Sequence, residues 1–347
     1  MTRIRSAAVA AIVIFSSCLA ADSQDAAKTI PQDPTALMTL AHEKNGLVGA
    51  DVKPWHMRGT YHAFKDGKPE YEGIYEEWWI SPTQYKITFT NPKQTQTDYA
   101  TGAALLRDGS QKWLEGPEEL LRASVVDPLP DPSLLKPFTL VRRERKVGNE
   151  KLECVSLTSP VGSNPQVSAD YYPAECFGAS LPVLRIFKDG SEQIVHDQLI
   201  QFQGHFIAKN IHVWNQGKTL ADLQLDVVET LKQSPESVIN PPSSALPVDL
   251  TRIPLNQGKT LFPALLKKAF PVYPDIAKGR RVEGTVTIKA TIRADGHVEN
   301  PEVVDGPMEL RAASLDGVKQ WIYRPVEVMG KPIPVEIEIH VVFSFGY

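Results

Sequence analysis

The chain has 347 residues, which is long for one ordinary domain and suits two. Apolar residues make up 42% of it, enough to form packed cores, and the formal net charge is only -4. This weak charge, without a stripe dense in Lys and Arg, gives no electrostatic basis for binding nucleic acid. The 28 prolines cluster between periodic segments, as in proteins built of strands and loops.

The first 21 residues have the layout of an export signal peptide. Two arginines precede the apolar run 6–15, and small residues follow up to Ala21. An uncleaved membrane anchor is a second interpretation, although the whole run would reach only about 24 Å as a helix, against about 30 Å of hydrocarbon. A third makes Cys18 a lipidation site, because Phe15-Ser16-Ser17-Cys18 loosely resembles a lipobox. Each interpretation predicts a chain that is exported or attached to a membrane.

Two cysteines remain once Cys18 is removed or lipidated. In an exported chain, the even pair Cys154 and Cys176 predicts a disulfide. Closing a loop of about twenty residues would stabilise the fold by about 3 kcal/mol in the chain-entropy model. The alternative is two buried free thiols. The sequence has no CxxC motif, so neither a redox motif nor a zinc site is indicated.

Residues 22–231 predict a β-rich domain with an N-terminal helix. The helix covers residues 34–44, with Asp33 as its cap and Gly46 just past its end. Asp-Gly pairs between β-rich runs predict hairpins at Asp66-Gly67, Asp108-Gly109 and Asp189-Gly190. Only residues 118–126 predict another helix in this region. So many hairpins favour a large antiparallel sheet that curls, and the fold class is therefore α+β, mainly antiparallel β.

Residues 232–260 predict a Pro-rich linker, and a second pattern begins after it. Residues 282–293 alternate between apolar and polar, Asp295-Gly296 turns the chain into a second strand, and the last strand alternates again. Between them, a helical stripe is predicted on Met308, Ala312, Leu315, Val318 and Ile322. Gly317 inside this helix suggests a close packing approach. The pattern predicts a small ββαβ domain over residues 261–347.

A combination of short motifs runs through this second domain. It comprises Tyr273-Pro274-x-x-Ala277, Gly284-x-Val286, Asp295-Gly296-x-Val298, Ala313, Val318, Trp321-x-Tyr323-x-Pro325, Gly330-x-Pro332 and Phe343. In this combination the domain resembles the C-terminal domain of TonB. The resemblance implies β-strand addition, in which an exposed sheet edge pairs with the TonB box, a short extended peptide of an outer-membrane transporter.

The resemblance also implies which residues the partner meets. They lie in the last strand and in the segment that ends in Tyr-Pro: Phe270, Pro271, Val272, Tyr273, Val335, Glu336, Ile337, Glu338, Ile339, His340, Val341, Val342 and Phe343. The alternative is that Tyr273, Trp321 and Tyr323 only hold the core together. A TonB has an anchoring helix and a long spacer where this chain has a signal-like segment and a folded domain. Coupling to a proton-driven motor therefore stays open, with envelope scaffolding as the other interpretation.

The layout of residues 34–231 resembles, more weakly, the LolA-like half-barrels of periplasmic lipid and lipoprotein carriers. The supporting features are Gly46, Gly59-Thr60-Tyr61, Asp66-Gly67 and Gly73-x-Tyr75-x-Glu77-x-Trp79. This resemblance implies an apolar concavity able to hold an acyl chain. The candidate lining residues are Trp55, Trp78, Trp79, Phe89 and Trp113. The alternative is that these aromatic residues fill a core.

The sequence offers no positive case for catalysis. The 8 histidines are scattered, and the pairs His56 with His62 and His205 with His212 lack Asp, Glu or Cys at metal spacing. No catalytic residue, metal or cofactor is predicted, and an exported hydrolase is the least favoured interpretation. The main hypothesis is a periplasmic binding protein that docks an outer-membrane transporter or another envelope protein. The alternative is a soluble periplasmic carrier that binds a lipid or lipoprotein acyl chain.

Overall fold

The protein is described here by a computed structural model that covers residues 30–345, except 115, 137, 159–172, 190, 233–235, 252 and 258–264. The predicted signal peptide, with Cys18, lies outside these residues. Among the described residues, no helix is both long and apolar enough to cross a membrane.

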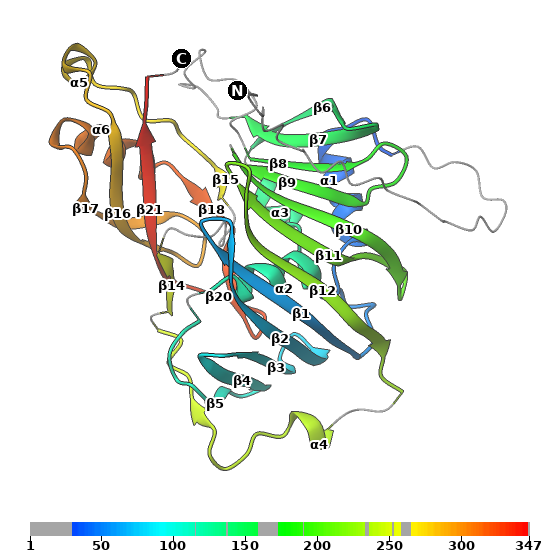
Figure 1. The fold of residues 1–347 in the computed structure, drawn as a ribbon. Coiled ribbons are helices and arrows are strands. Elements are labelled where there is room, and N and C mark those ends of the chain that lie inside the picture. Colours follow the sequence, from blue (N-terminus) through cyan, green and yellow to red (C-terminus); the bar gives the residue numbers. More distant parts are fainter. Residues whose placement is uncertain are drawn as a thin grey trace, which may run out of the picture.

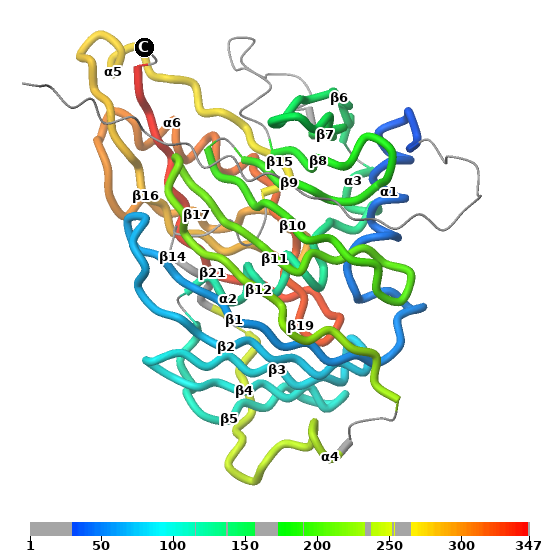
Figure 2. The backbone as a smooth tube through the Cα atoms, turned by 45° about the vertical axis from the view of Figure 1, so that its right-hand side comes forward, coloured from blue at the N-terminus to red at the C-terminus, as the bar shows by residue number. Residues whose placement is uncertain are grey.

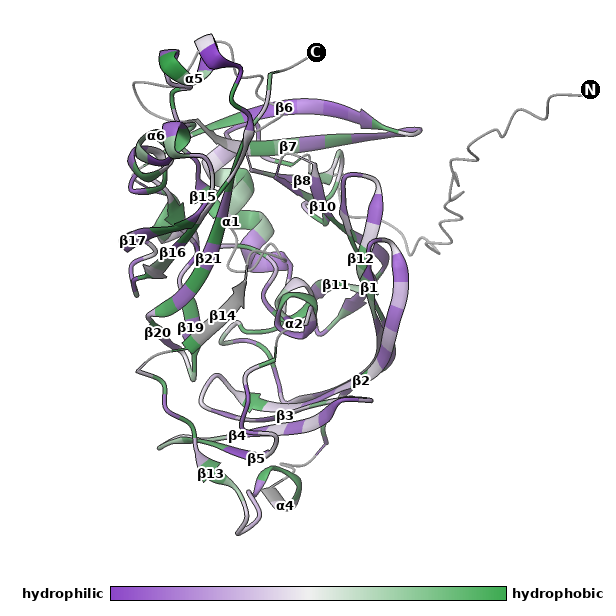
Figure 3. Cartoon of the chain, turned by 60° about the vertical axis from the view of Figure 1, so that its left-hand side comes forward, coloured by the Kyte–Doolittle hydropathy of each residue, from purple (hydrophilic) through white to green (hydrophobic). Residues whose placement is uncertain are grey.

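The first domain is one antiparallel sheet that curls without closing (Figures 1 and 3). The meander β1–β5 joins the meander β6–β12 where β1 pairs with β12. The predicted fold class is confirmed. In spatial order the strands are β13 (Leu246–Pro247), β5 (Leu105–Gly109), β4 (Gln94–Thr101), β3 (Gln84–Asn91), β2 (Lys68–Ser81), β1 (Trp55–Lys65), β12 (Lys218–Thr230), β11 (His205–Asn215), β10 (Glu192–Phe202), β9 (Leu184–Asp189), β8 (Ala174–Gly178), β7 (Glu150–Thr158) and β6 (Thr139–Val147).

The predicted turns have different outcomes. Asp66 and Gly67 have φ values of 54° and 76°, the left-handed conformation that a two-residue hairpin turn needs, and they join β1 to β2. Strands β9 and β10 pair from Asp189 to Glu192, so a hairpin forms there too. The hairpin predicted at Asp108-Gly109 is wrong. Strand β5 ends at Gly109 and pairs with β4 and β13, because the chain then leaves the sheet towards a helix.

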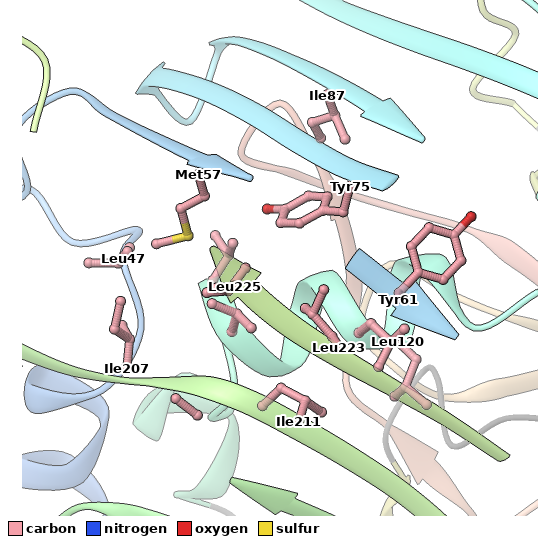
Figure 4. Packing of buried hydrophobic residues seen from close by; sticks show 14 of the residues in the cluster. Leu47, Met57, Tyr61, Tyr75, Ile87, Leu120, Ile207, Ile211, Leu223 and Leu225 are labelled. Carbon is pink, nitrogen blue, oxygen red and sulfur yellow. The ribbon is translucent and has the colours of Figure 1, made fainter. Parts of the chain in front are cut away.

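That helix, α2 (Glu118–Val126), lies in the concave face of the sheet (Figure 3). Leu120 packs among strand residues such as Tyr61 and Leu223 in the main core (Figure 4). At the start of the helix, Oε1 of the buried Glu118 accepts hydrogen bonds from the hydroxyls of Tyr61 (2.9 Å) and Tyr71 (3.2 Å). Both packing and hydrogen bonding therefore fix α2 against the sheet.

Two further helices close one end of the half-barrel. Helix α1 (Pro34–Lys44) buries Leu37, Met38 and Ala41, and Asp33 caps it by accepting a 2.8 Å hydrogen bond from the Ala36 N–H. Helix α3 (Pro132–Leu135) contributes Leu135 to the same apolar cluster. The expected first helix and its cap are thus present.

The segment predicted as a linker contributes a strand to each sheet. After α4 (Glu236–Ile239), β13 extends the large sheet beside β5. The next strand, β14 (Ile253–Gln257), joins the sheet of the C-terminal domain. In its described part, the segment therefore lies along both domains.

The C-terminal domain is a four-stranded sheet in the order β14, β21 (Val335–Phe343), β16 (Gly284–Ile292) and β17 (Val298–Asp305). Helix α6 (Met308–Val318) packs against the sheet, with α5 (Asp275–Arg280) beside it (Figure 1). Two short pairs complete the domain: β15 (Leu265–Lys267) with β18 (Ile322–Tyr323), and β19 (Val326–Val328) with β20 (Lys331–Ile333). The predicted β, β, α, β succession is present.

The predicted stripe of α6 is confirmed at Leu315 and Val318, which pack in the core, and is wrong elsewhere. The helix ends at Val318, and Met308 at its start is 80% exposed. The buried positions are Leu310, Ser314, Gly317 and Val318. The face is rotated because Gly317 packs on Pro271: a Cβ at this glycine would lie 3.2 Å from the Pro271 Cβ. The close approach predicted for Gly317 is therefore confirmed.

Candidate docking edge of the C-terminal sheet

The last strand, β21, has one face in the core and one side on a neighbouring strand. Val335, Ile337, Ile339, Val341 and Phe343 are buried, as their alternation predicts. Strand β16 pairs with β21 along its whole length, from Ile292 opposite Val335 to Gly284 opposite Phe343, without a register shift. Because β16 and the core hold β21 rigidly, its other side is a preformed template for backbone pairing.

Part of this other side is paired with the chain's own strand β14. The two strands run parallel, with Ile253 opposite Val335, Pro254 opposite Glu336 and Gln257 opposite Glu338. Ile253 is 2% exposed and belongs to the same core as Val335. Beyond Glu338, the described residues give β21 only β16 as a neighbour. The edge thus already accepts one extended segment in parallel.

The opposite edge of the sheet is protected against pairing. In β17, Pro301 has no N–H to donate, and Asn300 has a left-handed φ of 49°. The pairing of β17 with β16 shifts register twice. Glu299 and Glu302 are exposed along it. Bulges, proline and charge are the usual means of blocking an edge, which leaves the β21 side of the sheet as the candidate for pairing with another strand.

The predicted second part of the site, residues 270–273, lies at the C-terminal end of β21. The Tyr273 ring stacks on Phe345 with centroids 4.9 Å apart and meets the edge of Phe343 at 5.2 Å. Its hydroxyl donates a 2.7 Å hydrogen bond to the backbone oxygen of Val282. Val272 is 77% exposed. The structure therefore brings the two predicted parts together through Tyr273 and Phe343.

The other two aromatic residues of the motif lie in the core. Trp321 and Tyr323 are 5% and 7% exposed. Nε1 of Trp321 donates a 2.7 Å hydrogen bond to the oxygen of Ala269, which fixes the chain just before residue 270. Burial raises the pKa of the Tyr323 hydroxyl, and the charges of Asp189 and Glu192 add to this effect. Both side chains thus hold the domain together, whereas Tyr273 borders the edge.

The five aromatic residues predicted to line a lipid cavity lie in three places. Trp55, Trp79 and Phe89 are buried in the main core. Trp78 stacks on His56 with ring centroids 3.7 Å apart. Trp113 packs against the core of the C-terminal domain, under the guanidinium of Arg107 at 4.3 Å. Helix α2 occupies the concave face of the sheet (Figure 3).

A pocket in the described residues lies elsewhere, at the α1 end. It is small, with room for about one water molecule. Its lining comes from both domains: Met38, Leu135, Leu140, Val155, Ser156, Pro173, Glu175, Leu265 and Leu266. Burial raises the pKa of Glu175, at this pocket, to about 7.

The two domains are docked against each other, which sequence patterns did not indicate. Val328 and Met329, at the β19–β20 hairpin, pack against the core of the half-barrel. Figure 2 shows β19 beside α2. In return, Leu266 of β15 joins the cluster around α1. The C-terminal hairpin therefore covers part of the concave side.

The predicted cysteine pair and the histidines considered as metal ligands lie in the first domain. Cys154 and Cys176 form a disulfide between the paired strands β7 and β8. His56 lies between Glu76 and Glu229, at 3.0 and 2.8 Å, so the fold supplies carboxylates that the sequence spacing did not reveal. Among the described residues, no group of three or more His, Cys, Asp or Glu side chains is arranged to hold a metal ion.

Comparison with known proteins gives one family match. A family model described as the C-terminal domain of the Gram-negative bacterial TonB protein matches residues 269–345. No curated protein matches the chain. Similar solved structures include a LolA superfamily protein from Nitrosomonas europaea, with 10% identity, a TM-score of 0.37, and coverage of 61% of this chain and 99% of that one. A DUF1329 family protein from Desulfovibrio piger has 6% identity, a TM-score of 0.39, and coverage of 60% and 95%.

These matches correspond to the two resemblances predicted from the sequence. The first of these structures belongs to the LolA superfamily, the group that the layout of residues 34–231 resembles. The C-terminal match is independent of them and falls inside the predicted second domain. Residues 269–345 thus form a domain similar to the C-terminal domain of TonB.

Proposed function

We propose that the C-terminal domain is a peptide-docking module of the bacterial cell envelope, which binds an extended segment of a partner protein by strand addition to β21. The observation that carries this proposal is the parallel pairing of β14 with β21. The edge already forms this kind of contact with a segment of its own chain. Backbone N–H and C=O groups supply such affinity, and side chains on alternate positions supply specificity.

The partner is an outer-membrane TonB-dependent transporter or another envelope protein, and the site is periplasmic. Support comes from the match of residues 269–345 to the TonB family and from the export-like N-terminal sequence. The function is binding, without a catalytic step.

The alternative function, carriage of an acyl chain in the first domain, demands a rearrangement. Helix α2 fills the concave face with Leu120, Leu121 and Val125, which are all at most 4% exposed. The β19–β20 hairpin also covers this side. A lipid would have to displace both, so copurified lipid in the mature protein would favour the carrier.

Titration of the full mature chain with TonB-box peptides, followed by backbone amide NMR shifts, tests the docking proposal. We expect the shifts to concentrate on residues 335–343 and 270–273. A matched peptide that is N-methylated at alternate amides keeps its side chains but loses backbone donors, so it should not bind. No shifts at millimolar peptide, or shifts centred on β17, would contradict the proposal.

A further inference from the structure

We infer that β14 is a tethered competitor, which occupies the Val335–Glu338 part of the docking edge and must leave before a partner can pair along all of β21. This inference rests on the proposed docking function. It concerns the regulation of that site, and it identifies the first occupant as a segment of the chain itself.

Strand β14 pairs with β21 in the way that an added partner strand would. It is extended, runs parallel to β21 and pairs with it at three positions, beginning with Ile253 opposite Val335. Ile253 is buried in the core of the C-terminal domain, together with Val335 and Ile337. A partner strand on the same edge would need the same backbone groups, so the two occupants exclude each other.

Several features make β14 weaker than a full strand. It has five residues, and Pro254 lacks an N–H to donate. Its register shifts between Pro254 and Gln257. By contrast, β16 pairs with β21 over nine consecutive positions without a shift. A partner with regular pairing over the whole edge can therefore replace β14 without disturbing β16.

The tether keeps β14 at a high local concentration. Five residues separate it from β13, which pairs with β5 in the first domain. Just after β13, the Val248 N–H donates a 3.0 Å hydrogen bond to the oxygen of Leu105. A short tether gives an effective concentration in the millimolar range. The apparent affinity for a free peptide falls by the fraction of molecules in which the edge is open.

The experiment compares the full mature chain with Ile253→Asp, which places a charge where β14 enters the core, and with the matched control Ile253→Val. The probe is a fluorescent peptide with the sequence of residues 251–259, and binding is read by anisotropy. We expect Ile253→Asp to bind the peptide at least about tenfold more tightly than the wild type, because the local competitor is lost. Ile253→Val should bind it as the wild type does.

A second variant tests the same idea without weakening the core. Cysteines introduced by Gln257→Cys and Glu338→Cys stand at paired positions, so a disulfide between them would lock β14 on the edge. The peptide should not bind while this bond, verified by mass spectrometry, is closed. Reduction should restore binding to the wild-type level, with the wild type under the same reductant as the control.

The outcomes separate this inference from the docking proposal. If the peptide binds the wild type and Ile253→Asp equally well, and the amide shifts lie on β21, then the docking proposal stands and the inference that β14 competes is wrong. Wild-type binding by the locked variant would also overturn it. If none of the variants binds this peptide or TonB-box peptides, the edge takes no strand and both ideas fail.

Discussion

Nη1 of Arg324, in the C-terminal domain, donates a 2.6 Å hydrogen bond to the backbone oxygen of Asp127, which follows α2 in the first domain. The same guanidinium also pairs with the Asp127 carboxylate. Elsewhere on the junction, Nζ of Lys268 lies 3.1 Å from Oδ1 of Asp189. These pairs join the half-barrel to the C-terminal domain. Substituting their residues therefore tests how much the junction contributes to the stability of the protein.

Replacing Arg324 with Ala should weaken the junction. The side chain is 16% exposed, and hydrogen bonds to charged groups contribute about 1.5–3 kcal/mol each. We expect the free energy of unfolding, from urea denaturation, to fall by about this amount. The control is Arg280→Ala, because Arg280 is 64% exposed in its pair with Glu309 and should cost less than about 1 kcal/mol. Equal losses in the two variants would contradict the assignment.

Alanine substitutions at Gly317 and Gly279 test how tightly residues 270–273 pack on α6, because the two glycines have different surroundings. Alanine favours a helix over glycine by about 1 kcal/mol. At Gly279 in α5 an added Cβ meets nothing within 4 Å, so Gly279→Ala should stabilise the protein. At Gly317 the Cβ would be 3.3 Å from the Cα of Pro271, so Gly317→Ala should destabilise it and shift the amide resonances of Val272 and Tyr273. Stabilisation by both substitutions would show that Pro271 moves freely.

The elements that sequence predicted well are those fixed by local patterns. Alternation in β16 and β21 identified the buried face, because side-chain direction in a strand repeats every two residues. The segments 34–44 and 118–126 are helices with the expected bounds, and Cys154 pairs with Cys176. The fold class followed from these local features and from the number of hairpins.

The features that escaped prediction depend on contacts between distant residues. The linker composition around Pro254 gave no sign of pairing with β21, since strand partners are chosen in space. Trp78 and Trp79 are adjacent in β2, but which of them is buried depends on the pairing of β1 with β2, which places Trp78 beside His56 and Trp79 in the core with Trp55. The buried face of α6 was missed because Pro271 selects it. In each case, tertiary packing decides among patterns that the sequence alone allows.

The disulfide should be a main support of the β6–β8 end of the sheet. It joins cysteines 22 residues apart, and a loop of this length corresponds to about 3 kcal/mol in the chain-entropy model. The double variant Cys154→Ser with Cys176→Ser should lose about this amount of unfolding free energy in urea. Dithiothreitol should reduce the stability of the wild type but not that of the variant. A wild type that is insensitive to reduction would contradict this role.

Glu192 should make the stability of the junction depend on pH. Burial and the charge of Asp189 raise its pKa to about 7, against an ordinary value of 4.5. Between these two values the folded state binds more protons than the unfolded state, so the free energy of unfolding should fall as pH rises from about 4.5 to about 7, and then level off. Glu192→Gln removes the ionisation, so its stability relative to the wild type should rise across this window. Urea denaturation at pH 5, 6, 7 and 8 measures the difference, and Glu70→Gln, in an exposed pair with Lys93, is the control. The same trend in both variants would mean that a general loss of negative charge, rather than burial at Glu192, causes the effect.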